Sequence, residues 1–224
     1  MFEKQKQDVI NAALLMDRYG LIALSGGNVS ARMDNGDILV TPSGMIYSEM
    51  APDDMLVMDL EGNIKEGARK PSVDTGALLY VFKHRPDINS VIHTHQPYAT
   101  AIGLVQDEFP VCVTTLANAT KGPVKVCPFT SAASTDMGIE TVNNLGDTLA
   151  VILKHHGVMA VGTSLREALY ACVYLEEAAK TYLIAKSAGT VALLTPAQVE
   201  QAVNVFKYYG QGTAAVPDEV VRKV

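Results

Sequence analysis

The sequence predicts an α/β protein of three layers (α/β/α), with helices flanking a central, mostly antiparallel or mixed sheet. Short apolar runs rich in β-branched residues alternate along the chain with longer stretches of helical periodicity. Of the 224 residues, 48% are apolar and 19% are charged, which supplies enough core-forming side chains to exclude a disordered chain. No internal repeat or linker-like stretch divides the sequence, so we expect a single domain over residues 1–224.

The helices are predicted from apolar periodicity and from their terminal residues. The clearest helix begins at a capping box, Ser164 with Glu167 three residues later, and ends before Gly189. A second capping pattern, Thr195 with Gln198, has proline at the favoured first helical position. The predicted helices cover residues 5–18, 75–84, 134–145, 164–188 and 195–207.

The strands are predicted from short β-type runs bounded by turn residues such as GG, DNGD, PSG and EGN. The last two runs flank a Lys-His-His segment and form either a hairpin or one bent strand. The predicted strands cover residues 21–24, 38–41, 55–60, 90–95, 110–115, 124–129, 150–153 and 157–162.

The charge balance excludes several classes of partner. The chain has 18 basic and 24 acidic side chains, a formal net charge of −6, and no basic cluster that could release counterions from a nucleic acid. No apolar run approaches the roughly 20 residues of a membrane span, and the N-terminal residues lack a signal-peptide core. We therefore expect a cytoplasmic protein with no nucleic-acid or membrane partner. The three cysteines show no C-x-x-C spacing, so we expect buried thiols rather than a thiolate metal site.

The histidines are the strongest indication of chemistry. His93 and His95 alternate around Thr94 in a predicted strand, so both imidazoles project from one face. Such a pair is either a buried, hydrogen-bonded feature or half of a metal site, because a catalytic zinc needs three or four donors with one position left open. His155 or His156 could supply a third imidazole, and the spacing does not distinguish between them.

Three loops with small polar residues could approach an anion such as phosphate. They are GGNVS at 26–30, TPSG at 41–44 and PSVDT at 71–75. The last one precedes a predicted helix, so Ser72 or Asp74 could equally be a helix cap. Taken singly, each loop could also be an ordinary turn.

Together these motifs resemble the class II aldolase/adducin family, which includes sugar-phosphate aldolases of the L-fuculose-1-phosphate aldolase type and L-ribulose-5-phosphate 4-epimerases. The matching segments occur in the family's order and span nearly the whole chain: GGNVS (26–30), TPSG (41–44), KPSVDT (70–75), HTH (93–95), HHG (155–157) and YYGQ (208–211).

The resemblance implies a role for particular residues. It implies a divalent metal, usually Zn²⁺ and otherwise Mn²⁺ or Co²⁺, held by His93, His95 and His156, with Asp74 as the acid/base that also reaches the metal when substrate is absent. It implies that a neighbouring subunit of a cyclic homotetramer contributes Tyr209 to the site. The implied phosphate-binding residues are Gly27, Asn28, Ser43, Gly44 and Ser72.

The resemblance implies a lyase of carbohydrate metabolism acting on a phosphorylated sugar, and two departures from the epimerases favour aldol cleavage. Asp74 and YYGQ are typical of the epimerases, but Asn118 stands where an epimerase acid is expected, and Gln198 stands where an epimerase histidine is expected. Because an amide cannot transfer a proton at neutral pH, cleavage is easier here than epimerisation. We expect cleavage of a ketose 1-phosphate to dihydroxyacetone phosphate and a small aldehyde through a metal-stabilised enediolate. The alternatives are L-ribulose-5-phosphate 4-epimerase activity, decarboxylation of a phosphorylated sugar acid, and a non-catalytic, adducin-like interaction module.

Overall fold

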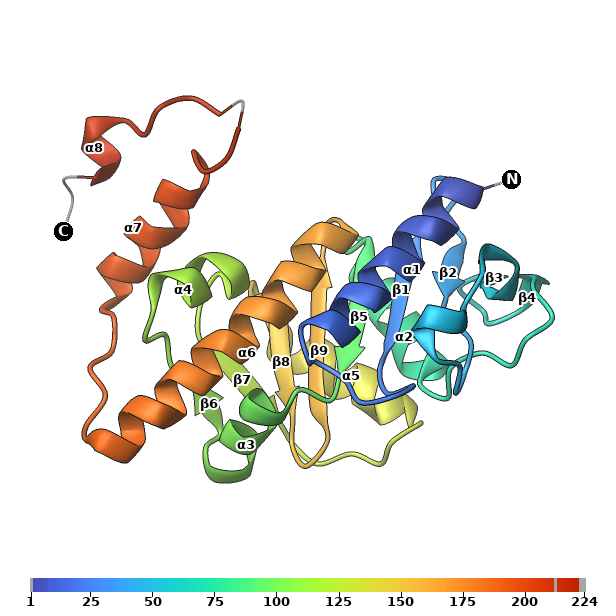
Figure 1. The fold of residues 1–224 in the computed structure, drawn as a ribbon, viewed down its shortest axis with the longest axis horizontal. Helices are drawn as coiled ribbons and strands as arrows, with labels where there is room; N and C mark the ends of the chain where they lie inside the picture. The colour runs from blue at the N-terminus through green and yellow to red at the C-terminus, as the bar shows by residue number, and fades with distance from the viewer. Residues whose placement is uncertain (1, 212, 222–224) are drawn as a thin grey trace.

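The computed structural model describes residues 2–211 and 213–221. Its centre is a nine-stranded sheet in the order β4-β3-β2-β1-β5-β9-β8-β7-β6 (Figure 1). Neighbouring strands are antiparallel except β7 and β8, which are parallel, so the predicted mostly antiparallel, mixed sheet is confirmed. The strands are β1 (Asn28–Arg32), β2 (Ile38–Val40), β3 (Leu56–Met58), β4 (Ile64–Glu66), β5 (Ser90–Thr94), β6 (Glu108–Phe109), β7 (Val124–Cys127), β8 (Ala150–Leu153) and β9 (Gly157–Gly162).

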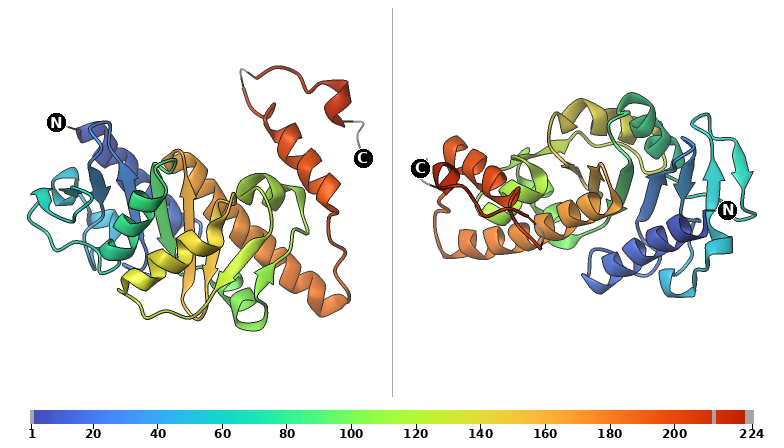
Figure 2. Two further views of the ribbon diagram at one scale, coloured as in Figure 1. Left: turned by 180° about the vertical axis from the view of Figure 1, so that it is seen from behind. Right: turned by 90° about the horizontal axis from the view of Figure 1, so that it is seen from above.

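Helices cover both faces of this sheet, as predicted (Figure 2). On one face lie α1 (Glu3–Arg18), α3 (Pro97–Val105), α4 (Thr114–Thr120) and α6 (Leu165–Ala188), and on the other lie α2 (Thr75–His84) and α5 (Thr135–Leu145). Successive strand residues therefore enter different cores: Ile92 packs with α1 and α6, whereas Val91 packs with α2 and α5. Burial on both faces explains why the central strands read as nearly continuous apolar runs.

The remaining helices lie outside these two layers. Two short 3₁₀ helices, Tyr47–Glu49 and Pro52–Asp54, connect β2 to β3. Near the C-terminus, α7 (Pro196–Phe206) packs against α4, and α8 (Asp218–Val221) packs against α7 at one end of the molecule (Figure 1). Within the described part of the chain, no helix combines the length and the apolar character that a bilayer crossing requires.

The predicted strand at 21–24 is wrong. This segment turns back between α1 and β1: Gly20 has φ +67°, Leu24 has φ +55°, and the carbonyl of Leu21 accepts the His95 N–H at 3.1 Å. Leu21 is buried and Leu24 is 79% exposed. Residues 21–24 therefore form a turn that places one side chain, Leu21, in the core. The strand itself starts at Asn28, four residues after this segment ends.

The predicted strand at 110–115 is also wrong. Val111 is buried and its carbonyl accepts the Leu194 N–H, but the chain then enters α4 at Thr114. Helix α3 was not predicted from the sequence; it begins directly after the His95-Gln96 dipeptide, with Pro97 at its first position. The last two predicted strands do form a hairpin, because β8 and β9 pair antiparallel from Leu153 and Gly157 onward.

Candidate active site

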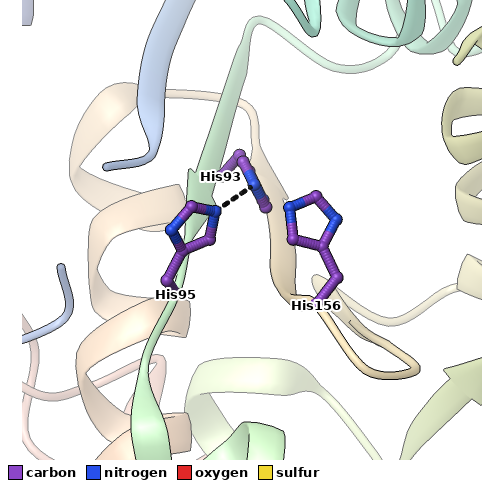
Figure 3. Close-up of side chains that lie close together, drawn as sticks. All are labelled: His93, His95 and His156. Atoms are coloured by element: carbon purple, nitrogen blue, oxygen red, sulfur yellow. Dashed lines mark hydrogen bonds between the residues drawn. The ribbon is translucent and has the colours of Figure 1, made fainter. Parts of the chain in front are cut away.

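Three histidines from two separate segments meet at one end of the sheet (Figure 3). The Nε2 atoms of His93 and His95 lie 3.1 Å apart, and one potential ligand nitrogen from each of His93, His95 and His156 lies within 4.8 Å of the others. His93 is fully buried, His156 is half-buried and His95 is exposed, so the cluster is open on one side. The two histidines of the HTH motif therefore do meet, as their strand spacing predicted.

Backbone pairing explains why His156, and not His155, joins the pair. β5 pairs with β9, which places Thr94 opposite Val158, and the β8–β9 turn lies beside the end of β5. In this turn His155 has φ +61°, a left-handed conformation that points its ring toward Phe129, 6.2 Å away between centroids. The backbone N–H of His156 donates to the Leu153 carbonyl, and the centroid of its ring lies 4.7 Å from that of the His93 ring.

Gly157 allows this close approach of the hairpin. A β-carbon at Gly157 would lie 2.0 Å from the carbonyl oxygen of Thr94. No side chain can be accommodated there without moving the backbone, so the glycine of the HHG motif lets the turn carry His156 up to the end of β5.

The protonation of His93 suits a cation ligand. Its Nδ1 lies 2.9 Å from the Val158 carbonyl oxygen and donates to it, which leaves the lone pair on Nε2, facing His95. Burial lowers the pKa of His93 to about 4, against the opposing charge of Asp74, and burial also lowers the pKa of His95. Both imidazoles are therefore neutral at pH 7.

The donor set fits a divalent transition metal. Neighbouring nitrogens around a tetrahedral zinc are separated by about 3.3 Å, given bonds of about 2.0–2.1 Å. The Nε2 atoms of His93 and His95 are 3.1 Å apart without any rearrangement. An imidazole brings no negative charge to a metal, so a set of three leaves the charge of the ion uncompensated and one coordination position open, the composition typical of a catalytic site.

Asp74 lies beside the histidines rather than capping a helix. It occupies the N-cap position of α2, but its side chain makes no capping hydrogen bond. Its Oδ2 accepts a hydrogen bond from Asn28 Nδ2 (2.9 Å) and lies 4.0 Å from His93 Nε2, and its Oδ1 accepts one from the Ala133 N–H (3.2 Å). The carboxylate is buried and directed toward the cluster, where it can exchange protons with a bound molecule.

The three predicted anion-binding loops lie side by side next to Asp74. Asn28 Nδ2 also donates to Ser72 Oγ (3.1 Å), and the Ser43 N–H donates to the Lys70 carbonyl. Two positions in these loops favour glycine because their backbone is left-handed: Gly27 has φ +74° and Gly44 has φ +68°. At Gly27 a β-carbon would also lie 2.5 Å from the His93 carbonyl oxygen.

Two contacts beside the histidine cluster were not predicted from the sequence. The buried Tyr47 hydroxyl donates to the Gly27 carbonyl at 2.8 Å and supports the loop, and burial raises its pKa. Ala133 presents its N–H to Asp74 from a left-handed conformation, φ +62°. No sequence pattern marks either residue, because a lone tyrosine and an alanine in a small-residue segment are common everywhere.

Tyr209 lies away from the histidines of its own chain. It follows α7, its side chain is 76% exposed, and its ring packs only loosely on Phe206, with centroids 5.4 Å apart. The helix that precedes it stands beside α4, at the far end of the sheet from β1 and β2 (Figure 1). The structure therefore does not bring Tyr209 to the cluster within one chain.

Comparison with known proteins agrees with the site geometry. Residues 7–183 match the family model described as "Class II Aldolase and Adducin N-terminal domain". A 5-deoxy-D-ribulose 1-phosphate aldolase of Bacillus thuringiensis serovar kurstaki is 30% identical over 213 residues, 94% of this chain and 99% of the relative. The L-ribulose-5-phosphate 4-epimerase UlaF of Salmonella paratyphi C is 33% identical over 199 residues, 82% of this chain and 86% of the relative.

Solved structures give the same result. An L-fuculose 1-phosphate aldolase superposes with a TM-score of 0.85 at 28% identity, covering 91% of this chain and 96% of that protein. The L-fuculose-1-phosphate aldolase of Thermus thermophilus superposes with a TM-score of 0.71 at 28% identity, covering 82% of this chain and 96% of that protein. This chain therefore belongs to the class II aldolase and adducin family, among its aldolase-type enzymes.

Proposed function

We propose that this enzyme cleaves a ketose 1-phosphate, in a metal-dependent retro-aldol reaction, to dihydroxyacetone phosphate and a small aldehyde. The observation that carries the proposal is the convergence of three imidazoles, two of them with lowered pKa values, beside a buried carboxylate, with Asp74 Oδ2 4.0 Å from His93 Nε2. The similarity to a 5-deoxy-D-ribulose 1-phosphate aldolase over nearly the full length of both chains supports cleavage as the reaction.

His93, His95 and His156 would hold the metal, which we propose is Zn²⁺, with Mn²⁺ or Co²⁺ as substitutes. When bound, the metal supplies a Lewis acid that polarises the substrate carbonyl. Imidazole nitrogens suit zinc and other first-row transition metals better than they suit magnesium or calcium, which prefer oxygen donors.

The neutral loops would bind the substrate phosphate. Three adjoining segments carry the proposed phosphate-binding residues, which are Gly27, Asn28, Ser43, Gly44 and Ser72. Small side chains let the chain approach an anion closely, and fixing the phosphate there would hold the reacting carbons at the cluster.

Two residues would move protons. A base takes the proton of the hydroxyl on the carbon that becomes the aldehyde, the carbon–carbon bond breaks, and its electron pair remains on the dihydroxyacetone phosphate half. We assign to Asp74 the protonation of the dihydroxyacetone phosphate carbon that keeps this electron pair. We assign the hydroxyl proton to Tyr209 of a neighbouring subunit, because Tyr209 is exposed and distant from the histidines of its own chain. The enzyme would then be a cytoplasmic cyclic homotetramer with sites between subunits.

The second candidate function is L-ribulose-5-phosphate 4-epimerase activity. The 33% identity to such an epimerase supports it. Epimerisation has to cleave the bond, rotate the aldehyde and rejoin it on the opposite face, so it needs acid/base groups on both sides. Asn118, in α4, is an amide and does not transfer protons at neutral pH, which favours cleavage alone. A non-catalytic, adducin-like role has less support, because a complete donor set and a buried acid are present.

A panel of ketose 1-phosphates and pentulose 5-phosphates, incubated with the protein loaded with Zn²⁺, Mn²⁺ or Co²⁺, tests the proposal. Release of dihydroxyacetone phosphate, detected by a coupled dehydrogenase, is the expected result. Interconversion of L-ribulose and D-xylulose 5-phosphates without net cleavage would favour the epimerase instead. A purified protein that binds no stoichiometric divalent metal would favour the non-catalytic role.

A further inference from the structure

We propose that Glu176, a buried residue of α6, is a positioning residue for the metal ligand His95. Glu176 would act through the backbone that follows β5 and would touch neither the metal nor the substrate. The inference rests on the proposed function for one assignment, that of His95 as a metal ligand. It explains how an exposed histidine beyond the end of a strand keeps its place beside His93.

His95 lacks the ring contact that usually orients a metal-binding histidine. Such a histidine commonly donates its second ring N–H to a carboxylate, a carbonyl or water, and His93 donates to the carbonyl of Val158. Among the residues that the structure describes, no protein acceptor meets Nδ1 of His95, which faces Gly26: a β-carbon there would lie 3.0 Å from it. The position of this ring therefore depends on its own backbone, which lies beyond β5, since β5 ends at Thr94.

The residue after His95 is fastened to α6. Gln96 is fully buried, its Oε1 accepts the Thr94 hydroxyl at 2.7 Å, and its Nε2 donates to the Cys172 carbonyl at 3.2 Å. The carbonyl fixes the orientation of this amide, because a carbonyl can only accept a hydrogen bond. The His95 N–H itself donates to the Leu21 carbonyl at 3.1 Å. Hydrogen bonds therefore hold the backbone at His95 and at the residue that follows it.

Glu176 makes a second attachment, at the start of α3. Its Oε1 and Oε2 accept the N–H groups of Tyr98 and Ala99, each at 2.9 Å. Pro97 has no N–H, so these are the first two donors of α3, and neither has a partner within the helix. Glu176 lies four residues after Cys172, so one face of α6 makes both attachments. Helix α6 passes beside α3 on the same face of the sheet (Figure 1).

Capping of α3 alone would not require a residue from another helix. A serine, threonine, asparagine or aspartate at position 96, the N-cap, could cap these N–H groups locally. The chain has Gln96 there, which makes no capping hydrogen bond, and it supplies a carboxylate from 77 and 78 residues away. A buried carboxylate costs free energy that its hydrogen bonds must offset, so its use indicates a role that a local cap would not fulfil.

That role is to tie the His95 segment to the helix that also packs on the other two histidine segments. Helix α6 packs on β5, which carries His93, and on β9, which begins directly after His156. A local cap would satisfy the N–H groups of α3 and leave this segment free to move relative to α6. With Glu176 in place, α6 sets the position of His95 relative to both other imidazoles.

The test measures metal binding without any substrate. Co²⁺ is added to chelator-treated wild type, Glu176→Gln and Leu145→Ala at about pH 8, and its visible absorption spectrum reports both the affinity and the arrangement of ligands. Glu176→Gln keeps the shape of the side chain but replaces one oxygen by an NH₂ group, which cannot accept the N–H of Tyr98 or Ala99. Leu145→Ala is the control for lost stability, because Leu145 is buried at the end of α5, in the core on the opposite face of the sheet. Urea denaturation gives the stability of each protein.

For Glu176→Gln we expect Co²⁺ to bind about tenfold more weakly and with a changed spectrum, an effect of the size typical of residues that hold a metal ligand in place. Leu145→Ala should lose stability but keep the wild-type affinity and spectrum. Gln96→Ala removes the other attachment, so it should resemble Glu176→Gln, and it replaces that variant in the comparison if Glu176→Gln does not fold.

Two results would overturn the inference about Glu176. One is a folded Glu176→Gln variant that binds Co²⁺ with the wild-type affinity and spectrum. The other is an equal change in Leu145→Ala, because the effect would then follow stability alone. Wild-type protein that binds no Co²⁺ is a different outcome: it would overturn the proposed metal site itself, and this inference with it.

Discussion

Gly157 packs directly against the carbonyl oxygen of Thr94, so that a β-carbon at Gly157 would lie only 2.0 Å from that oxygen. Gly157→Ala therefore forces the β8–β9 turn away from β5. We expect a loss of at least about 2 kcal/mol in the free energy of unfolding, because overpacking against backbone is relieved only by backbone movement. Chemical denaturation measures the change. Weaker metal binding should accompany it, because His156 moves with the turn.

Gly189→Ala is the matched control for that substitution. Gly189 follows α6, its φ of 162° is extended backbone, and a β-carbon there would meet nothing within 4 Å. The Gly189→Ala variant should therefore be at least as stable as the wild type. Equal stability of the two variants would show that the Gly157 contact yields more easily than the structure implies.

The adjacent histidines of the β8–β9 turn should behave differently. His156→Ala removes one of three converging imidazoles. We expect a fall in metal affinity of more than about a hundredfold, exceeding the effect typical of residues that only hydrogen-bond to a metal ligand. In His155→Asn the new side chain also tolerates the left-handed φ of +61°, so the turn should be unchanged and this variant should keep the metal. Metal analysis after gel filtration distinguishes them, and metal retention by His156→Ala would contradict the assignment.

Tyr209 should act across a subunit boundary. Tyr209→Phe is expected to keep its metal and lose turnover, because the exposed phenol lies away from the three histidines of its own chain. Asp74→Asn should also be inactive. If one subunit supplies the carboxylate and the next supplies the phenol, refolding the two variants together in equal amounts should restore about a quarter of the wild-type activity.

The mixing experiment has an internal check. Each variant refolded alone should remain inactive, so any activity of the mixture comes from mixed assemblies. Normal turnover by Tyr209→Phe, or an inactive mixture of variants that do co-assemble, would remove Tyr209 from the site.

Ala133 carries backbone strain next to Asp74. A non-glycine residue at φ +62° is disfavoured by about 1–2 kcal/mol, and glycine relieves this cost while losing some backbone entropy. We expect Ala133→Gly to stabilise the protein by about 0.5–1 kcal/mol in thermal unfolding. Ala132→Gly, at a neighbouring alanine without positive φ, should instead destabilise it by up to about 1 kcal/mol. The same sign for both substitutions would argue against strain at Ala133.

Glu176, in α6, should make stability depend on pH in a defined direction. It is buried and accepts the N–H groups of Tyr98 and Ala99 at the start of α3. Burial raises the pKa of its carboxyl above the unfolded value of 4.5, so the unfolded chain releases this proton first as pH rises. Stability contributed by the protonated form is therefore complete below pH 4.5 and is lost as pH increases through the folded-state pKa.

Comparison with Glu176→Gln isolates this effect from other titrating groups. The free energy of unfolding of the wild type, relative to the variant, should decrease as pH rises from 4.5 at constant protein concentration. Denaturant titrations of both proteins between about pH 4 and 8 provide the measurement. If the difference in unfolding free energy between the two proteins stays constant or grows with pH, then folding does not disfavour the ionised form of Glu176.

Local patterns predicted most of the layers of this fold. The capping boxes at Ser164 and Thr195 mark real helix starts, since in both cases the hydroxyl accepts the predicted N–H. Strand periodicity likewise predicted that His93 and His95 would meet. These features depend on interactions within a few residues, and the sequence therefore contains them directly.

Features set by tertiary contacts could not be read in the same way. The choice between His155 and His156 depends on one left-handed residue in a turn. The position of the Asp74 carboxylate depends on hydrogen bonds from Asn28 and Ala133, which lie 46 and 59 residues away in the chain. The run at 21–24 is apolar because Leu21 fills the core from a turn, which periodicity cannot distinguish from a strand. Motif order, rather than local physics, identified His156 and Asp74 in advance.

The two edge strands of the sheet are short. At one end β4 has three residues, all exposed, and Lys65 forms an ion pair with Asp37, while at the other end β6 has only two residues. Two copies of the chain that paired through these edge strands could therefore form very few main-chain hydrogen bonds, which protects an otherwise open sheet from fibrous aggregation. Any assembly of these subunits has to be held by side chains from helices and loops, so its symmetry and strength can change by surface substitution without disturbing the strands that hold the histidines.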